Sequence, residues 1–366
     1  MAQRDSKIDA VLLASVLLLI GFGIVMVYSA SSFYSLKKFN DEFFFLKKQA
    51  VFAVAGILIL YVFSRIDARF LKYLAYPALI GSVAMLIALF TSLGLTVGGA
   101  TRWLDLGSFN IQPSEFAKIS IILYLAYSMA RKGEKMKDFS IGVLPHLIVI
   151  GIFFLLIKTE PDFGNALLIG ILAFCMLYIG GARLHHLLGI FVLALPLVIY
   201  EVIHAGYRMR RLIAFLNPWQ DLTGAGFQLV QSFIAFGSGG FWGRGLGNGR
   251  QKLFYLPAAH TDFIFSNIGE EVGFIGILFT VMLFVIFAWR GYCAVKSVDD
   301  YFLVYLGTGI VMLILIEAAI NMCVGLGTLP TKGLTLPFVS YGGSSMIVSC
   351  ACAGILLNLS SSGGRA

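Results

Sequence analysis

Residues 10–30 read AVLLASVLLLIGFGIVMVYSA, an apolar run that contains no charged side chain. A helix of about 20 residues is long enough to cross the hydrocarbon core of a bilayer. The run is longer than the apolar core of a cleaved signal peptide, and no small-residue cleavage site follows it after a basic start. We therefore expect a retained membrane span, and similar runs recur along nearly the whole chain.

The composition extends this expectation to all 366 residues, of which 59% are hydrophobic and only 13% are charged. A soluble domain carries about 25% charged residues, whereas strands of a membrane barrel alternate over about ten residues. The sequence thus predicts an all-α polytopic membrane protein, one membrane domain over residues 1–366. We place about ten spans at 9–30, 49–64, 71–93, 115–130, 140–157, 162–181, 184–205, 267–289, 301–325 and 338–358.

An even number of spans places both termini on one side of the membrane. Long loops translocate regardless of charge, so the longest loop is left out of the count. The remaining Lys and Arg residues are more numerous on the side of the termini. We therefore expect both termini in the cytoplasm. Basic residues still collect on the outer face, where either an anionic ligand or anionic headgroups would explain them.

The loop between spans seven and eight, residues 206–266, is long, rich in glycine and aromatic. A loop of this length is usually functional or disordered, and its aromatic content argues against disorder. Residues 226–236 are expected to form a short interfacial helix with aromatic side chains toward lipid. The stretch GLGNGR at 245–250 fits neither nucleotide fingerprint, although its backbone amides offer a place for a diphosphate.

Charged residues gather where spans begin. Glu115 and Lys118 are three apart, so they share one helix face and can pair. Asp162 opens the sixth span, where a helix cap is the simpler explanation. Asp262 lies between the loop and an apolar stretch without a neighbouring cation in sequence, so desolvation should raise its pKa toward that of a general base. Glu317, inside the ninth span, favours a buried, hydrogen-bonded role over a catalytic one.

The histidines and cysteines do not indicate a metal site or a disulfide framework, since neither type shows ligand spacing. We expect the cysteines to be small apolar residues of the helix core. They are Cys175, Cys293, Cys323, Cys350 and Cys352.

Four segments resemble the signature motifs of the SEDS family of peptidoglycan glycosyltransferases, in family order. They are QPSEFAK (112–118), EPDFG (160–164), YLPAAHTDFIFSNIGEEVGFIG (255–276) and LPTKGLTLPFVSYGGSS (329–345). Within the family, GLGNGRQKLFYLP (245–257) and Lys332-Gly333 resemble the division (FtsW) branch more than the elongation (RodA) branch.

This resemblance implies polymerisation of lipid II into glycan strands at the outer face of the bacterial cytoplasmic membrane, during septal wall synthesis. It implies a class B penicillin-binding protein and other divisome membrane proteins as partners, lipid II and polyprenyl diphosphate as ligands, and no nucleic acid. By motif match, the essential aspartate of the family is Asp262.

The chemistry requires a base for the acceptor hydroxyl, for which Asp262 is the candidate, and fixed positive charge for the departing diphosphate. The candidate cations on the outer face are Arg102, Arg208, Arg210, Arg211, Arg244, Arg250, Lys252 and Lys332. Of these, Arg102, Arg210, Arg250, Lys252 and Lys332 are preferred. The groove would be supported by Glu115, Lys118, Asp162 and Glu270. No cofactor is assured; Mg²⁺ or Mn²⁺, held by Asp262 or Glu115 with the diphosphate, is an open alternative.

Three other functions remain open at this point. An elongation-type polymerase would use the same chemistry. A lipid II flippase would explain the spans and the charges, but it should show internal repeats with broken helices, and none is evident. A non-catalytic scaffold for the penicillin-binding partner predicts that Asp262 is dispensable.

Overall fold

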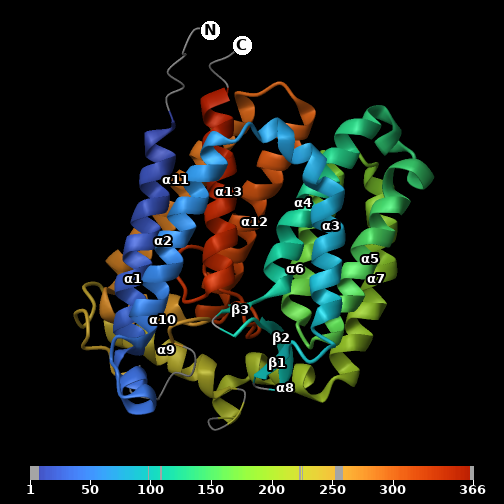
Figure 1. Ribbon diagram of the computed structural model, residues 1–366. Coiled ribbons are helices and arrows are strands. Elements are labelled where there is room, and N and C mark those ends of the chain that lie inside the picture. Colours follow the sequence, from blue (N-terminus) through green and yellow to red (C-terminus); the bar gives the residue numbers. More distant parts are fainter. Residues whose placement is uncertain are drawn as a thin grey trace.

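The computed structural model describes residues 8–97, 99–107, 109–221, 224, 226–251 and 259–362. Long helices stand roughly side by side in a bundle, and a small sheet with several short helices lies at one end of it (Figure 1). The long helices are α1 (Ala10–Phe39), α2 (Phe44–Arg65), α3 (Leu71–Ala88), α4 (Pro113–Lys132), α5 (Leu144–Thr159), α6 (Phe163–Ile179), α7 (Leu184–His204), α11 (Gly273–Lys296), α12 (Tyr301–Gly325) and α13 (Gly343–Ser362).

The predicted helical, polytopic fold is confirmed, and each expected span overlaps one of these helices. Within the described ranges, 8 helices are long and apolar enough to cross a membrane. The two others are α6, which is apolar but shorter, and α4, which carries Glu115, Lys118, Arg131 and Lys132. A count of ten spans therefore stays an expectation.

Local signals explain where several helices begin and end. The side chain of Asp9 accepts hydrogen bonds from the amides of Val11 and Leu12 at the start of α1, and Asp300 accepts one from Phe302 at the start of α12. These caps satisfy amides that have no partner within the helix. Helix α4 opens on Pro113, which lacks the amide hydrogen that a first turn leaves unpaired.

The expected eighth span, 267–289, is wrong at its start. The structure has two helices there, α10 (Ile264–Glu271) and α11, which begins at Gly273 with φ +73°. A Cβ at Gly273 would lie 2.3 Å from the backbone nitrogen of Gly243. The long loop therefore packs directly against the break, and only glycine fits there.

A small antiparallel sheet follows α3 and departs from the all-α expectation. Its strands are β1 (Gly94–Val97), β2 (Ala100–Asp105) and β3 (Asn110–Ile111), in the order β1-β2-β3. The third span was predicted to reach residue 93, but α3 ends at Ala88. Strand β2 places Arg102 at the end of the bundle where the sheet lies.

The long loop contains α8 (Gly206–Leu216), α9 (Phe227–Gly239) and α10. The helix predicted at 226–236 is confirmed as α9, but the expected lipid-facing aromatic side chains are wrong. Phe236 packs on Phe265 with ring centroids 5.9 Å apart, and a Cβ at Gly327 would lie 2.3 Å from the ring of Phe233. Both rings therefore pack against the bundle.

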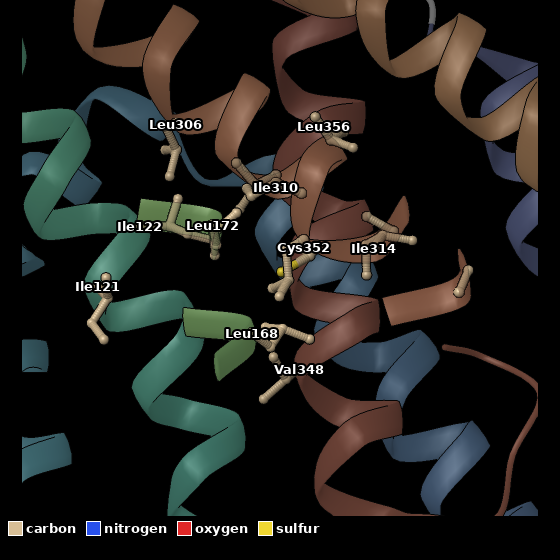
Figure 2. Packing of buried hydrophobic residues seen from close by; sticks show 14 of the residues in the cluster. Ile121, Ile122, Leu168, Leu172, Leu306, Ile310, Ile314, Val348, Cys352 and Leu356 are labelled. Atoms are coloured by element: carbon tan, nitrogen blue, oxygen red, sulfur yellow. The ribbon is translucent and has the colours of Figure 1, made fainter. Parts of the chain in front are cut away.

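The core lies between α4, α6, α12 and α13, whose apolar side chains interdigitate (Figure 2). Cys352 is fully buried among them, as expected for a small apolar core residue. The Asp9 amide donates to Ser360 Oγ at 3.4 Å, so both described ends of the chain lie at one end of the bundle. The sheet and α8–α10 lie at the opposite end (Figure 1).

Candidate active site

A cavity of about 1060 Å³ opens at the end of the bundle opposite the chain ends. Its walls come from four parts of the chain: the start of α2, the sheet, the turn before α10, and the segment that leads into α13. The lining residues are Lys47, Lys48, Val51, Phe52, Leu95, Val97, Arg102, Trp103, Gly107, Phe109, Asn110, Gln112, Thr261, Asp262, Gly333, Thr335, Tyr341, Gly342, Gly343, Ser344 and Ser345.

Asp262 is the one acidic residue in this lining, as far as the structure describes it. Burial raises the pKa of its carboxyl to about 7; the charges of Arg211 and Arg102 lower that pKa, and Asp162 raises it further. A carboxyl with such a pKa is poised to accept a proton near neutral pH. The predicted desolvation of Asp262 is therefore present.

The backbone around Asp262 is held at three successive carbonyl groups. The amide of Tyr341 donates to His260 O at 2.9 Å, and Ser340 Oγ donates to Thr261 O at 2.7 Å. Asn321 Nδ2 donates to the carbonyl of Asp262 itself at 3.0 Å. The turn is therefore fixed by the segment before α13 and by α12.

Arg102 and Asp162 form the side of the site nearest α6. Arg102 Nη2 donates to Pro161 O at 2.5 Å, and its Nε lies 4.0 Å from Asp162 Oδ2. Asp162 also caps α6, since its Oδ1 accepts from the Asn165 amide and its Oδ2 from Asn165 Nδ2. The helix cap expected for Asp162 is therefore present, and its role as a support of the groove stays a prediction.

Glu160 is a buried carboxyl beside them that the sequence prediction did not include. Both carboxyl oxygens lack a hydrogen-bond partner among the described residues. Burial, followed by the charge of Asp162, raises the pKa of Glu160 to about 8, while Arg102 opposes the shift. Glu160 is therefore expected to be largely protonated at neutral pH.

The predicted pair of Glu115 and Lys118 is present, with Lys118 Nζ 2.7 Å from Glu115 Oε1. Lys118 also forms a buried ion pair with Glu317 of α12, as the hydrogen-bonded interpretation of Glu317 predicted. None of the three lines the cavity. They fix α4 against α12 and support the site from inside the bundle.

The glycine stretch before Asp262 does not offer its amides to a ligand as expected. The amides of Arg250 and Gln251 donate to the two oxygens of buried Glu270, at 2.8 and 3.2 Å. The amide of Gly247 donates to Glu271 Oε2 at 3.1 Å. Glu270 therefore anchors the loop and does not line the cavity.

The predicted cations are only partly brought together. Arg102 lines the cavity, whereas Arg250 and Arg210 have exposed side chains and do not line it. Lys332 is half-buried beside the site: a Cβ at Gly164 would lie 3.9 Å from its side chain and 3.8 Å from Asp162 Oδ1. Lys252 lies outside the described residues.

The sequence prediction missed Lys47 and Lys48, and it gave Arg211 only as one of the wider set of outer-face cations. Lys47 and Lys48 line the cavity, where Lys47 lies 2.8 Å from Asp41 and Lys48 lies over the ring of Phe44. The sequence signal that could have found them was a Lys-Lys pair at the outer start of the second span. Because we expected that span to begin at residue 49, the pair was assigned to a loop. Arg211 of α8 donates to Thr331 O at 3.3 Å.

The part of the chain that the structure describes can be searched for a protein metal site. In the described ranges, no group of three or more His, Cys, Asp or Glu side chains is placed to hold an ion. Glu115 is paired with Lys118, so the predicted combination of Asp262 with Glu115 does not fit. The lining, with one carboxylate and three cationic side chains, suits an anionic substrate.

Comparison with known proteins identifies the architecture. The family model FtsW/RodA/SpoVE, described as "Cell cycle protein", matches residues 9–363. The chain belongs to the FtsW/RodA/SpoVE family. This membership confirms the resemblance to SEDS proteins.

Relatives of the FtsW/RodA/SpoVE family cover nearly the whole chain. The probable peptidoglycan glycosyltransferase FtsW of Geobacter sp. (strain M18) is 45% identical over 359 residues, 98% of each chain. That of Trichlorobacter lovleyi is 48% identical over 98% of this chain and 94% of the relative. Stage V sporulation protein E of Bacillus subtilis is 36% identical, covering 98% of this chain and 99% of the relative. The names of the first two favour the division branch, as predicted.

Solved structures agree with this assignment. One, from a study of how a peptidoglycan synthase complex coordinates polymerization and crosslinking, matches with TM-score 0.80 and 27% identity over 98% of this chain and 99% of that chain. Thermus thermophilus RodA matches with TM-score 0.69 and 26% identity over 97% of both chains. The fold is thus that of the FtsW/RodA/SpoVE family.

The four motifs that suggested the family meet around one cavity. Gln112 of the first motif lines it, and the Gln112 amide donates to Ser344 Oγ of the fourth at 3.0 Å. Asp162 of the second motif lies beside Arg102, and Asp262 of the third lies in the lining. Segments far apart in sequence therefore build one site in this family member.

Proposed function

We propose that this chain is a peptidoglycan glycosyltransferase that polymerises lipid II during septal wall synthesis at the bacterial cytoplasmic membrane. The observation that carries the proposal is Asp262, with its raised pKa, in a cavity whose other charged lining residues are the cations Lys47, Lys48 and Arg102. Relatives of near-equal length that are named peptidoglycan glycosyltransferases support it.

In the proposed reaction, the carboxylate of Asp262 accepts the proton of the acceptor sugar hydroxyl. The hydroxyl oxygen forms a bond to the anomeric carbon of the donor sugar. The bond from that carbon to the diphosphate breaks, and its electron pair leaves with the polyprenyl diphosphate. Because this leaving group departs as an anion, no second carboxyl is needed to protonate it.

The cations of the lining have the complementary role of stabilising the charge that grows on the diphosphate. Arg102 is oriented by Pro161 O and Asp162. Lys47 and Lys48 stand at the start of α2, where the bundle ends and a lipid-linked substrate would place its headgroup. We assign these three residues to the diphosphate in preference to Arg210 and Arg250.

We further propose that the partner is a class B penicillin-binding protein of the division machinery, docked through its single span beside α11 and α12. The solved relative from a peptidoglycan synthase complex supports a synthase partner. Helix α11 presents an exposed apolar face for such a span. Its exposed side chains include Phe274, Leu278, Val285, Trp289 and Tyr292.

The proposal is tested with the purified chain and its partner in detergent or liposomes, using labelled lipid II and a gel for glycan polymer. Wild-type protein should form polymer, and Asp262→Asn should form none at matched expression and partner binding. A lipid II flippase would instead move lipid II across liposomes without polymer, and polymer from Asp262→Asn at the wild-type rate would remove the catalytic assignment.

A further inference from the structure

Asn321 is a buried amide of α12 that no motif contains. It is 1% exposed, and its Nδ2 donates to Asp262 O at 3.0 Å and to Leu334 O at 2.7 Å. An amide nitrogen has two hydrogens, so both are used. The two acceptors belong to segments that lie before and after α12 in the chain, and Asn321 joins them.

The position of Asp262 depends on such contacts because its own backbone is in a turn, outside the regular hydrogen bonding of α10. Two of the three bonds to the 260–262 carbonyls come from the segment before α13, through Ser340 and Tyr341. Asn321 supplies the third, and it is the bond to the carbonyl of Asp262 itself. It is also the contact that comes from a long helix.

The second acceptor, Leu334, places the opposite wall of the site. Its neighbour Gly333 faces the carboxylate, since a Cβ at Gly333 would lie 3.2 Å from Asp262 Oδ2. One side chain thus sets the distance between the carboxylate and the wall that confines it. A shift of either segment would change both the orientation and the hydration of the Asp262 carboxylate.

Helix α12 is itself held in place one turn earlier. Glu317, four residues before Asn321 and therefore on the same helix face, pairs with buried Lys118 of α4. Lys118 is bound in turn to Glu115 of the same helix. The amide of Asn321 is therefore presented from a helix that is fixed against its neighbour by ionic contacts.

We propose that Asn321 is a positioning residue for polymerisation, which holds the Asp262 turn and the Gly333–Leu334 segment in register through its two amide hydrogens. The inference rests on the proposed role of Asp262 as the base. A leucine at 321 has similar bulk but cannot donate a hydrogen bond. An aspartate keeps the shape of the side chain, but it places an oxygen where Nδ2 donated to the carbonyl oxygens of Asp262 and Leu334.

The test compares Asn321→Leu and Asn321→Asp with Asn358→Leu. Asn358 is a matched control because its Nδ2 also bridges two carbonyls, those of Ser64 and Ile66, at 3.0 and 2.8 Å, near the chain ends. Turnover, KM for lipid II, thermal stability and the pH profile are measured with the partner present. Asp262→Asn is measured beside them.

Both Asn321 variants should lose about 10- to 100-fold in turnover, since small misplacement of a reacting group has effects of that order. KM should change less than about twofold, because the cavity lining is intact. The pH midpoint of the residual activity should fall below about 7, because a loosened Asp262 carboxyl gains water and its pKa falls. The charges of Arg102, Arg211 and Asp162 still act on this carboxyl in the variants. Asn358→Leu should lower only stability.

Wild-type turnover and an unchanged midpoint in both Asn321 variants, with Asp262→Asn inactive, would overturn the positioning role. A turnover loss in Asn321→Leu no larger than in Asn358→Leu at equal loss of stability would show a merely structural role and would also overturn it. Activity in Asp262→Asn would instead refute the base assignment. Should the leucine variant fail to fold, Asn321→Asp carries the same test.

Discussion

The α-carbon of Gly333 lies against the carboxylate of Asp262, so that a methyl group there would stand 3.2 Å from Oδ2. This is tighter than an ordinary contact, and the carboxylate would have to move by a few tenths of an ångström. A side chain at position 333 would therefore displace the carboxylate of Asp262.

Gly333→Ala should lower the polymerisation rate by about 3- to 10-fold, because displacement of a catalytic group lowers the rate steeply. Gly342→Ala is the matched control: it lines the same cavity, but its Cβ would meet its nearest neighbour at an ordinary 3.5 Å. Rates of glycan formation at saturating lipid II give the comparison. Equal rates for the two variants would show that Gly333 does not confine the base.

The wild-type rate should rise with pH and reach half of its maximum near pH 7. Only the ionised form of Asp262 accepts a proton, and burial holds the pKa of this carboxyl at about 7. Asp262→Asn should lose about 100-fold or more and should not show this rise. Initial rates between pH 5.5 and 8.5 measure the midpoint, and a flat wild-type profile across this range would contradict the assignment.

The same group should affect stability with the opposite sign. Its pKa is raised from 3.8 to about 7, so its contribution to stability is fully present below pH about 4 and is lost as pH rises through about 7. Asp262→Asn should therefore melt at a higher temperature than wild type at pH 8 and at a similar temperature at pH 4. Thermal unfolding in detergent at both pH values tests this, and wild type should melt lower only at the higher pH.

Arg210 and Arg211 are neighbours on α8 that offer a matched pair of variants. Arg211 donates to Thr331 O, and its charge is the largest influence that lowers the pKa of Asp262. Arg210 has an exposed side chain and does not line the cavity. Arg211→Gln should shift the pH midpoint of activity upward, because a positive charge that favours the carboxylate is removed.

Arg210→Gln should leave that midpoint where it is in wild type. The two variants remove the same charge from adjacent positions of α8. A difference between their pH midpoints therefore measures the effect of the Arg211 charge on the carboxyl of Asp262. Identical midpoints would mean that the charge of Arg211 does not act on the carboxyl of Asp262.

Periodicity and composition were sufficient for the membrane helices, because a span is defined by about 20 apolar residues in sequence. The break at Gly273 was not visible in that pattern, since it depends on the close approach of Gly243. The sheet that carries Arg102 was missed because its strands are short and depend on pairing. In a hydropathy scan, such segments are indistinguishable from loops.

Asp262 was predicted as the candidate base from its position between loop and apolar stretch, whereas Lys47 and Lys48 of the cavity lining were not predicted. Charge alone ranked Arg210 and Arg250 with Arg102, but exposure to solvent or to the cavity is a property of packing. Glu270 shows the same limit: a carboxylate in a motif was assigned to the groove, yet it accepts loop amides. Asn321 had no sequence signal, since its role lies in contacts to distant segments.

Regulation by the partner can be examined through the two helices of the long loop, which differ in how firmly they are held. Helix α9 buries Ser232, whose Oγ donates to Gly325 O at 2.5 Å, and a Cβ at Gly239 would lie 1.9 Å from Gly269 O. Helix α8 buries only Ala214, although it carries Arg211 to the site. Opening α8 should therefore be the easier of the two.

We expect the partner to order α8 over the cavity and thereby fix the field at Asp262, so that the isolated chain is nearly inactive. The complex should stay active when the transpeptidase serine of the partner is mutated, because the effect is one of ordering, which offsets about 1–2 kcal/mol of backbone entropy per residue. Hydrogen exchange across residues 206–266 should show added protection at 206–216 and little change at 227–239, where α9 is already packed. Unchanged protection at α8, together with full activity of the isolated chain, would exclude this mechanism, whereas equal gains in both helices would mean that the loop orders as one unit.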